Sequence, residues 1–307
     1  MESDGGIEGK EQAGAGAGPR SLPSVPMSTD SAAFEADTGQ PISRLPASRL
    51  TTSHIRVVLV GTQHPGNIGA AARAMKTMGL SRLVLVAPEK APDRDTMAMA
   101  AGADDLVDAA PVFATLAEAV ADCRLVLGCT ARSRRIQLEQ LLPREAATRA
   151  VAAAGAAEVA LVFGRERTGL DNNELQLCHA AVHIPSDPAF SSLNLAAAVQ
   201  VLSYEVRMAS FDAPRAEVAM RATMPSNPNP PASHAELEGF FAQLADALDA
   251  IDFHKGRAPE SAMRKLRRLY LRGGLDSAEI RLLRGVLADT QRMARLARAA
   301  GGCEPEQ

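Results

Sequence analysis

The stretch IRVVLVGTQHPGNIGAAARAM (55–75) decides the fold class of this chain. It opens with Ile55–Val60, a short run rich in aliphatic residues that suits a strand buried on both faces of a parallel sheet. A turn with glycines at both ends (61–69) follows, and the alanine-rich residues after it favour a helix. Strand, turn and helix in this order form the repeating unit of an α/β domain, so we expect that class.

The same alternation continues to residue 210, with short apolar runs between helix-favouring segments. The further strands are expected at Arg82–Val86, Arg124–Leu127, Val159–Phe163 and Ala181–Ile184, and the helices at Gly69–Met78, Leu116–Asp122, Arg144–Ala154 and Leu193–Ala209. In the last helix, Leu195, Val199 and Leu202 recur at the spacing of one buried helical face. We therefore expect residues 51–210 to form one α/β domain.

Composition changes on both sides of this domain. Within residues 1–50, glycine, alanine, serine and proline fill 26 positions, which predicts a disordered extension. Residues 211–233 carry five prolines among serine, asparagine and alanine, which predicts an extended, proline-rich linker. Residues 234–307 show helical signals only, beginning with a capping box at Ser233 and Glu236. A small all-helical domain is expected there.

The first residues and the cysteines limit the class of protein further. Residues 1–11 are acidic and lack an apolar core, so a secretory signal is not expected. No run of about 18 apolar residues suits a membrane helix. The four cysteines, Cys123, Cys129, Cys178 and Cys303, show no metal-binding spacing. We therefore expect a cytoplasmic protein that holds no metal and contacts no membrane.

The total charge hides a basic region. The chain carries 33 Lys and Arg against 36 Asp and Glu, a net charge of −3, and only 3% of it is aromatic. These totals argue against a base-stacking RNA platform and against a polyanion coat. Residues 255–300, however, hold 12 basic and 4 acidic side chains, which resembles a footprint for a phosphate backbone. A solvated helix face is the alternative explanation for Arg264, Arg268 and Arg272, which recur every four residues.

The turn 61–69 has glycines where a strand enters a helix, which is typical of anion sites. Its Gly-x4-Gly spacing matches a P-loop, but Asn67 and Ile68 replace the required Lys and Ser or Thr, so a P-loop NTPase is excluded. A plain tight turn is the alternative. Arg73 lies one helical turn further on among alanines, and this setting favours an anionic partner over a solvated arginine.

Two later strand ends resemble ligand sites. Gly164 ends a strand and lets a ligand approach the backbone closely. An ordinary turn is the alternative there, with Glu166 in a surface ion pair with the arginines beside it. After the next strand, Ser191 and Ser192 are natural N-caps for the following helix. Asn194 then falls in the first turn, where its amide caps the helix or binds a ligand.

Three stretches together resemble the SpoU branch of the SPOUT superfamily, the RNA ribose 2′-O-methyltransferases. They are VGTQHPGNIGAAARAMKTMGL (60–80), LVFGRERTGL (161–170) and IPSDPAFSSLNLAAAVQVLSYEVRM (184–208), in that order and spacing. The stretches AAGADD (100–105), CTARSRR (129–135) and MRKLRRLYLR (263–272) narrow the resemblance. They resemble the bacterial tRNA (cytidine/uridine-2′-O-)methyltransferases that act at position 32 of the anticodon loop. The resemblance covers residues 54–300 and leaves the N-terminal extension unmatched.

The resemblance implies a SPOUT-type parallel sheet with a C-terminal trefoil knot, followed by a small helical domain. It implies a homodimer that binds tRNA and not DNA, with S-adenosylmethionine held by the loops of the knot and no metal. The catalytic positions that match are Asn67, Arg73, Glu166, Ser192 and Asn194. The cofactor-binding positions that match are Cys129, Thr130, Ala131, Gly164, Ile184, Ser191, Ser192 and Leu193. The RNA-binding residues expected in the helical domain are Arg264, Lys265, Arg268, Arg272, Arg281 and Arg284.

Two of these positions need comment. Relatives more often carry a hydroxyl residue at the position of Cys129, which a contact through the backbone tolerates. The role of Arg73 is open between a base and a clamp. A guanidinium group holds its proton at neutral pH, so we interpret Arg73 as a clamp on a phosphate that stabilises the developing alkoxide. Ser192 and Asn67 then orient the hydroxyl group.

Two other functions stay open on the sequence alone. One is 2′-O-methylation of a different tRNA or rRNA nucleotide, because target choice depends on how the helical domain docks a folded RNA. The other is a non-catalytic, knotted RNA-binding protein. The presence of Arg73, Glu166, Ser192 and Asn194 argues against the second.

Overall fold

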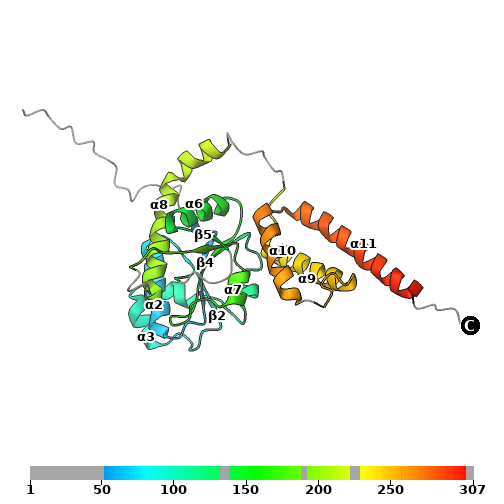
Figure 1. Cartoon of the computed structure of the whole chain (residues 1–307). Coiled ribbons are helices and arrows are strands. Elements are labelled where there is room, and N and C mark those ends of the chain that lie inside the picture. Colours follow the sequence, from blue (N-terminus) through cyan, green and yellow to red (C-terminus); the bar gives the residue numbers. More distant parts are fainter. Residues whose placement is uncertain (1–51, 132–137, 188–191, 222–228, 257, 302–307) are drawn as a thin grey trace, which may run out of the picture. The chain divides into compact units, whose positions relative to one another are not determined.

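The computed structural model of the chain describes residues 52–131, 138–187, 192–221, 229–256 and 258–301. Within them, a seven-stranded sheet with flanking helices precedes a set of three further helices (Figure 1). The extension expected at residues 1–50 lies outside the described residues. In the described part of the chain, none of the helices is long and apolar enough to cross a membrane.

The sheet is parallel throughout, and its strands are ordered β3-β2-β1-β6-β4-β7-β5. The strands are β1 Ile55–Val60, β2 Arg82–Val86, β3 Val112–Phe113, β4 Leu125–Cys129, β5 Glu139–Leu141, β6 Val159–Phe163 and β7 Ala180–Val182. All five expected strands are confirmed, with shifted ends at β4 and β7. The sequence did not predict β3 and β5, because strands of two and three residues carry no periodic pattern.

The helices around the sheet include every expected one and three short additions, α3, α4 and α7. They are α2 Pro65–Thr77, α3 Arg94–Ala100, α4 Asp104–Asp108, α5 Leu116–Ala119, α6 Pro143–Ala154, α7 Asn172–Gln176 and α8 Leu195–Arg221. Because α8 continues to Arg221, the expectation of an extended linker is wrong for residues 211–221. Their alanine, arginine, glutamate and methionine residues favour a helix strongly enough to outweigh one proline. Residues 222–228 of that linker lie outside the described residues.

The sheet is buried on both faces. On one face, Val57 and Leu59 of β1 pack with residues of α2, α6 and α8 (Figure 1). On the other face, Val58 and Val60 pack with residues of α5 and α7. Successive side chains of a strand point to opposite faces, so a strand covered on both sides needs an almost unbroken apolar run. This requirement explains the aliphatic runs from which the fold class was predicted.

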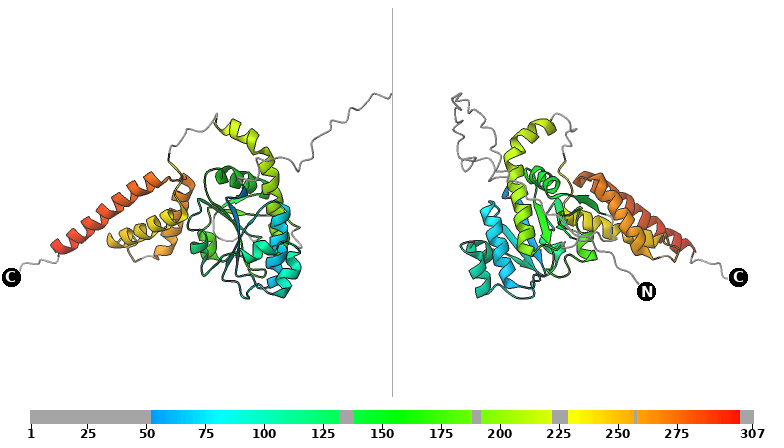
Figure 2. Two further views of the ribbon diagram at one scale, coloured as in Figure 1. Left: turned by 180° about the vertical axis from the view of Figure 1, so that it is seen from behind. Right: turned by 60° about the vertical axis from the view of Figure 1, so that its left-hand side comes forward.

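The second region is a set of three helices with a core of its own (Figure 2). The helices are α9 His234–Ala250, α10 Pro259–Gly273 and α11 Ser277–Gly301. Phe240 and Phe241 of α9 form its centre, and the ring of Tyr270 on α10 lies 4.9 Å from that of Phe240. The capping box expected at Ser233 is confirmed, because its backbone N–H donates to the Glu236 carboxylate at 2.7 Å.

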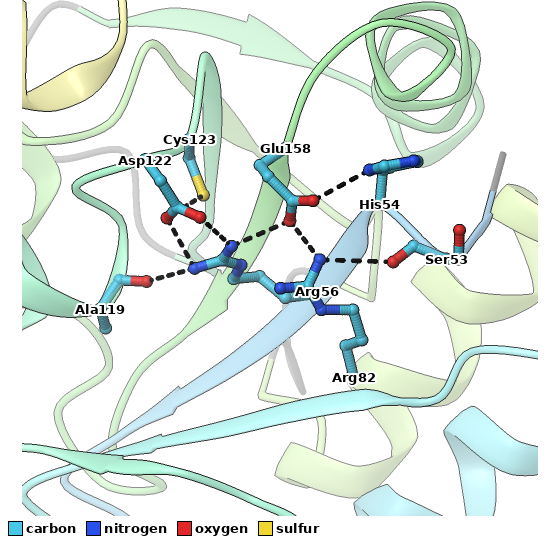
Figure 3. A network of polar contacts seen from close by, with 8 residues as sticks. All are labelled: Ser53, His54, Arg56, Arg82, Ala119, Asp122, Cys123 and Glu158. Carbon is cyan, nitrogen blue, oxygen red and sulfur yellow. Dashed lines mark hydrogen bonds and ion pairs between the residues drawn. The ribbon is translucent and has the colours of Figure 1, made fainter.

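Arg56 interrupts the aliphatic run of β1, and its side chain is buried near the amino end of that strand. Its guanidinium donates two hydrogen bonds to Asp122, at 2.8 and 2.6 Å, and one to Glu158 at 2.8 Å (Figure 3). Arg82 and His54 also contact the Glu158 carboxylate. Ligands of parallel sheets bind at the carboxyl ends of the strands, the opposite edge, so we assign this network to stability.

Glu158 contributes to this network through its charge. Burial raises its pKa, but hydrogen bonds from Arg56 and His54 and the charge of Arg82 outweigh burial and hold the pKa below its ordinary value of 4.5. A carboxylate with a depressed pKa stabilises the fold at any pH above its unfolded-state value. That contribution is lost as the pH falls through the lower, folded-state value.

We expect Glu158→Gln to lower the free energy of unfolding at neutral pH by about 1–3 kcal/mol, because hydrogen bonds to a charged group are lost. The gap between variant and wild type should narrow as the pH falls below about 4.5, where wild-type Glu158 takes up its proton. Urea unfolding of both proteins over a pH series measures this gap. A gap that stays constant down to the acid end contradicts the assignment.

Candidate active site

A pocket opens at the carboxyl ends of three neighbouring strands, β6, β4 and β7. Its walls are the residues that follow these strands, namely 129–131, the loop 164–169 and Ile184, together with residues at the start of α8. The carboxyl ends of parallel strands share one edge of the sheet, so segments distant in sequence meet there. The pocket therefore lies where ligands of α/β domains bind.

The pocket gathers seven of the eight residues predicted to bind the cofactor. They are Cys129, Thr130, Ala131, Gly164, Ile184, Ser192 and Leu193. The eighth, Ser191, lies outside the described residues. Apolar side chains, hydroxyl groups and accessible backbone occur together here, and small-molecule sites use this mixture to enclose a ligand and fix its orientation. The residues present therefore suit a nucleoside-like cofactor.

The loop 164–169 folds tightly on itself. The N–H of Gly169 donates to the carbonyl oxygen of Arg165 at 2.8 Å. A Cβ atom placed on Gly164 would lie 2.2 Å from backbone atoms of Gly169 and Leu170, so no side chain fits there. Gly169 itself has φ +67°, a left-handed conformation that glycine adopts without strain. These two glycines are what allows the loop backbone to form a wall of the pocket.

Cys129 contributes a neutral surface to the pocket. Burial raises the pKa of its thiol to about 12, so the sulfur stays protonated at neutral pH. A protonated, buried thiol is a weak nucleophile and packs as a small apolar group. This state agrees with a position that serves the ligand through its backbone.

Glu166 joins the loop 164–169 to the turn 61–69. Its carboxylate accepts hydrogen bonds from the backbone N–H groups of Gln63 at 3.0 Å and of His64 at 3.2 Å. It also accepts one from the side-chain amide of Asn67 at 2.8 Å. Three donors from one turn thus converge on a single carboxylate. The conformation of the turn 61–69 is thus stabilised by a residue of another loop, Glu166.

The hydrogen bonds keep Glu166 ionised. Burial raises the pKa of its carboxyl group, but the bonds from Asn67 and from the backbone N–H groups of Gln63 and His64 outweigh burial and lower the pKa below 4.5. An ionised carboxylate is an acceptor only. Glu166 therefore accepts three hydrogen bonds from the turn 61–69 in its ionised form.

Asn194 extends this arrangement to α8. Its side-chain amide donates to the side-chain oxygen of Asn67 at 3.3 Å, and its own side-chain oxygen accepts the N–H of Ala196 at 2.8 Å. Asn194 therefore caps α8, which begins at Leu195. The prediction that a serine caps this helix is wrong for Ser192, which is exposed and lines the pocket. Asn194, Asn67 and Glu166 form one hydrogen-bonded chain through all three motifs.

Arg73 stands apart from this chain. It is exposed on α2 and does not line the pocket. Its guanidinium forms no hydrogen bond or ion pair with any residue that the structure describes. The predicted catalytic residues thus divide into a fixed group of three, a pocket residue (Ser192) and an exposed cation available to an external anion.

The sequence reading missed two residues that the structure ties to the site. Arg165 was expected in a surface ion pair with Glu166, and this alternative is wrong, because Arg165 pairs with Glu174 of α7 at 2.9 and 3.0 Å. Arg165 lies in the motif LVFGRERTGL (161–170), and this position could have marked it as a candidate site residue. Glu174 carried only the capping-box pattern that it forms with Asp171, which marks the start of a helix and not a site.

The helical region presents the predicted cations at its surface. Arg264, Lys265, Arg268, Arg272, Arg281 and Arg284 are all exposed. Arg267, in the same basic run, is different: it contacts Glu238 and lies 4.5 Å over the ring of Phe241. Arg284 also donates to the Gln243 side chain at 2.9 Å. The basic run therefore contains both surface cations and a packing residue.

Among the residues that the structure describes, no three His, Cys, Asp or Glu side chains lie close enough together to bind a metal ion. The site therefore consists of a pocket, a hydrogen-bonded chain of residues beside it and an exposed arginine. These parts suit the binding and orientation of two reactants.

Comparison with known proteins identifies both regions. Residues 54–204 match the SpoU rRNA Methylase family, and residues 235–299 match the C-terminal domain of the tRNA methyltransferase TrmJ. The chain is 53% identical over 245 residues to the tRNA (cytidine/uridine/adenosine-2′-O-)-methyltransferase TrmJ of Pseudomonas aeruginosa, covering 78% of this chain and 95% of that one.

Two further relatives also carry the name TrmJ. The tRNA (cytidine/uridine-2′-O-)-methyltransferase TrmJ of Salmonella typhimurium is 48% identical over 238 residues, covering 78% of this chain and 96% of the relative. The crystal structure of TrmJ from Z. mobilis superposes with a TM-score of 0.65 at 36% identity, covering 76% of this chain and 97% of that one.

Proposed function

The chain belongs to the SpoU methylase family and, within it, to the TrmJ-type tRNA methyltransferases; from this membership we propose its reaction and target. The protein transfers a methyl group from S-adenosylmethionine to the ribose 2′-OH of cytidine or uridine at position 32 of the tRNA anticodon loop. The observation that carries the proposal is the hydrogen-bonded chain Asn194–Asn67–Glu166 beside the pocket. A protein that only bound RNA would have no need of it.

The pocket at β6, β4 and β7 holds the cofactor, which supplies an activated methyl group when bound. Ile184 and Leu193 offer apolar surface to a nucleobase. The backbone of the loop 164–169 and of residues 129–131 offers hydrogen-bonding groups, which explains why small residues suffice at these positions. Ser191 completes the predicted set.

The chain's own residues align the acceptor ribose. Asn67 is fixed by Glu166 and Asn194, and Ser192 lies at the edge of the pocket, so both are placed to orient the hydroxyl group. Arg73 binds the phosphate next to the target ribose and stabilises the negative charge that develops on the 2′-oxygen as its proton passes to water. Alignment and electrostatic stabilisation together account for the residues that the site contains.

The helical region supplies the grip on the tRNA backbone, with Arg264, Lys265, Arg268, Arg272, Arg281 and Arg284 as its phosphate contacts. The first four share the exposed face of α10, while the opposite face of that helix packs into the core through Leu266 and Tyr270. Side chains on one helix face follow a nucleic acid backbone together.

We expect the triple variant Arg264→Gln, Lys265→Gln and Arg272→Gln to weaken tRNA binding and to reduce the slope of log K against log salt by about 2–3. S-adenosylmethionine affinity should not change. Fluorescence titration at several salt concentrations measures the slope. The double variant Arg144→Gln and Arg149→Gln, which removes two exposed cations of α6, serves as the control. An unchanged slope in the triple variant contradicts the assignment of this face.

A homodimer, a trefoil knot and a cytoplasmic location belong to the same proposal. Tyr204 and Met208 lie one helical turn apart on α8 and are 48% and 40% exposed. They supply apolar surface that a second copy covers, next to the helix α2 that carries Arg73. The interleaved order of β1, β6, β4 and β7 is compatible with a knotted chain. A tRNA substrate supports the cytoplasm as the place of action.

Nucleoside mass mapping tests the proposed function. Unmodified tRNA is incubated with the protein and S-adenosylmethionine, and the 2′-O-methylated nucleosides are located by mass spectrometry of nuclease fragments. The expected result is a single methyl group at position 32 of transcripts with cytidine or uridine there. A methyl group elsewhere favours the second candidate, a different tRNA or rRNA target. If adenosine at position 32 is methylated as well, the protein accepts the same three nucleosides that the name of the Pseudomonas aeruginosa relative gives.

A further inference from the structure

Arg165 occupies a junction between three segments of the site. One guanidinium nitrogen, Nη1, donates to both carboxylate oxygens of Glu174, at 2.9 and 3.0 Å, so a charge-assisted contact joins the loop to α7. The Glu174 side chain is only 13% exposed, and it also accepts the N–H of Asp171 at 2.7 Å in the capping box of α7. Glu174 is therefore held in place independently of Arg165.

The stem of Arg165 lies against Gly61, the first residue of the turn 61–69. A Cβ atom on Gly61 would come within 2.7 Å of Nε and 2.9 Å of Cγ of Arg165. Gly61 has φ +60°, and its N–H donates to the carbonyl oxygen of Val86 at 2.8 Å. The arginine thus packs on the one residue type that leaves room for it at the base of this turn.

The neighbouring Glu166 contacts the same turn further along, through Gln63, His64 and Asn67. Two consecutive residues of the loop 164–169 therefore hold both the base and the far part of the turn 61–69. The same loop forms a wall of the pocket. Movement of Arg165 would change the pocket wall and the position of Asn67 together.

We propose that Arg165 is a positioning residue for methyl transfer. It holds the loop 164–169 between Glu174 and Gly61, and so fixes the position of the cofactor-pocket wall relative to the turn that carries Asn67. This inference rests on the proposed function. Arg165 lines the pocket as part of this loop, and its proposed effect is exerted through the positions of the loop and the turn. Loss of the Arg165 contacts with Glu174 and Gly61 should therefore lower both cofactor affinity and turnover, while tRNA binding, which depends on a separate basic face, stays the same.

The test compares Arg165→Ala, Arg165→Lys and Glu174→Gln in the full-length protein. For Arg165→Ala we expect S-adenosylmethionine affinity to fall about tenfold by calorimetry and single-turnover rate to fall about 10–100-fold, with KM for tRNA within about twofold of the wild type. Arg165→Lys keeps the charge but lacks the planar guanidinium that packs on Gly61, so it should recover only part of the loss. Arg149→Ala breaks an exposed ion pair between α6 and Glu139 of β5 and is the matched control.

A double-mutant cycle with Gly61→Ala sharpens the test. In the wild-type background the new methyl group collides with Arg165 and also strains a positive-φ position, so activity should fall. In the Arg165→Ala background only the backbone strain is left, so Gly61→Ala should cost less there by about tenfold in kcat/KM. Additive effects of the two substitutions overturn the direct contact on which the proposal depends.

The outcomes separate this inference from the proposed function. If the wild type methylates tRNA and Arg165→Ala matches it in cofactor affinity and rate, with only a lower melting temperature, Arg165 is structural and the inference fails alone. If the wild type binds no S-adenosylmethionine, the proposed function fails. Should Arg165→Ala not fold, Glu174→Gln keeps the arginine and weakens its contact with α7. The same result is expected of it: lower S-adenosylmethionine affinity and turnover, with an unchanged KM for tRNA.

Discussion

Arg73→Ala should abolish measurable methyl transfer, with a loss in kcat of about 10²–10³-fold or more, while S-adenosylmethionine binds normally. The physical reason is the setting of this side chain. Arg73 is exposed on α2, lies outside the pocket lining and has no bonding partner among the residues that the structure describes. Nothing in the cofactor pocket depends on it, so its removal should be felt only when the ribose and its phosphate are present.

Calorimetry with S-adenosylmethionine and single-turnover methylation of tRNA measure the two quantities separately. Arg73→Lys distinguishes the proposed clamp from a simple counter-charge, since lysine keeps the charge but cannot bind a phosphate with two parallel hydrogen bonds. We expect a partial recovery of the rate. Lys76→Ala, which removes another cation of α2, one that is paired with Asp105 of α4, is the control and should retain activity. Near-normal turnover of Arg73→Ala would remove Arg73 from the chemistry.

Glu166→Ala should lower kcat/KM by about 100-fold, because a shift of about 1 Å in an orienting group suffices for a loss of that size. The substitution leaves the N–H groups of Gln63 and His64 and the amide of Asn67 without their acceptor. The turn 61–69 then loses the contact that fixes Asn67. Steady-state kinetics with tRNA and S-adenosylmethionine varied in turn measures the effect.

The variant Glu166→Gln tests whether the carboxylate is an acceptor or a base. As an acceptor, its amide replacement keeps one oxygen for the turn and should lose only about tenfold in rate. Because hydrogen bonds hold the pKa of Glu166 below 4.5, the wild-type rate should show no ionisation from this group near neutral pH. Glu145→Ala is the matched control, since Glu145 also accepts a backbone N–H, from Leu142 at 2.9 Å, but at the start of α6. A Gln variant as inactive as Ala would favour the base.

Hydrogen-bond partners were the least predictable part of the site. The sequence placed Glu166 between two arginines and suggested a local ion pair. In the structure Glu166 binds the turn 61–69, with Asn67 99 positions away, and Arg165 binds Glu174. Strand order is the reason for the contacts of Glu166: β6 inserts between β1 and β4, which brings the loop after β6 beside the turn after β1. No local pattern encodes which strand a later strand will join.

The basic region shows the same limit on a smaller scale. Charge counting found the excess of cations at residues 255–300, and the structure exposes Arg264, Lys265 and Arg272. It also buries most of Arg267 against Glu238 and Phe241, although the sequence shows one continuous run of cations. Only the angle of each residue around α10, relative to the core, separates a surface cation from a packing one.

The sequence by itself determined the α/β class, the central strands and the glycine turns that follow them. These are short-range properties, since aliphatic runs and glycine turns are forced by burial and backbone geometry within a few residues. The tertiary structure decided which groups Glu166 binds and that the amide of Asn194 reaches Asn67. Both depend on which polar groups meet across the sheet edge, and hydrogen bonds of about 3 Å between such distant segments are set by packing.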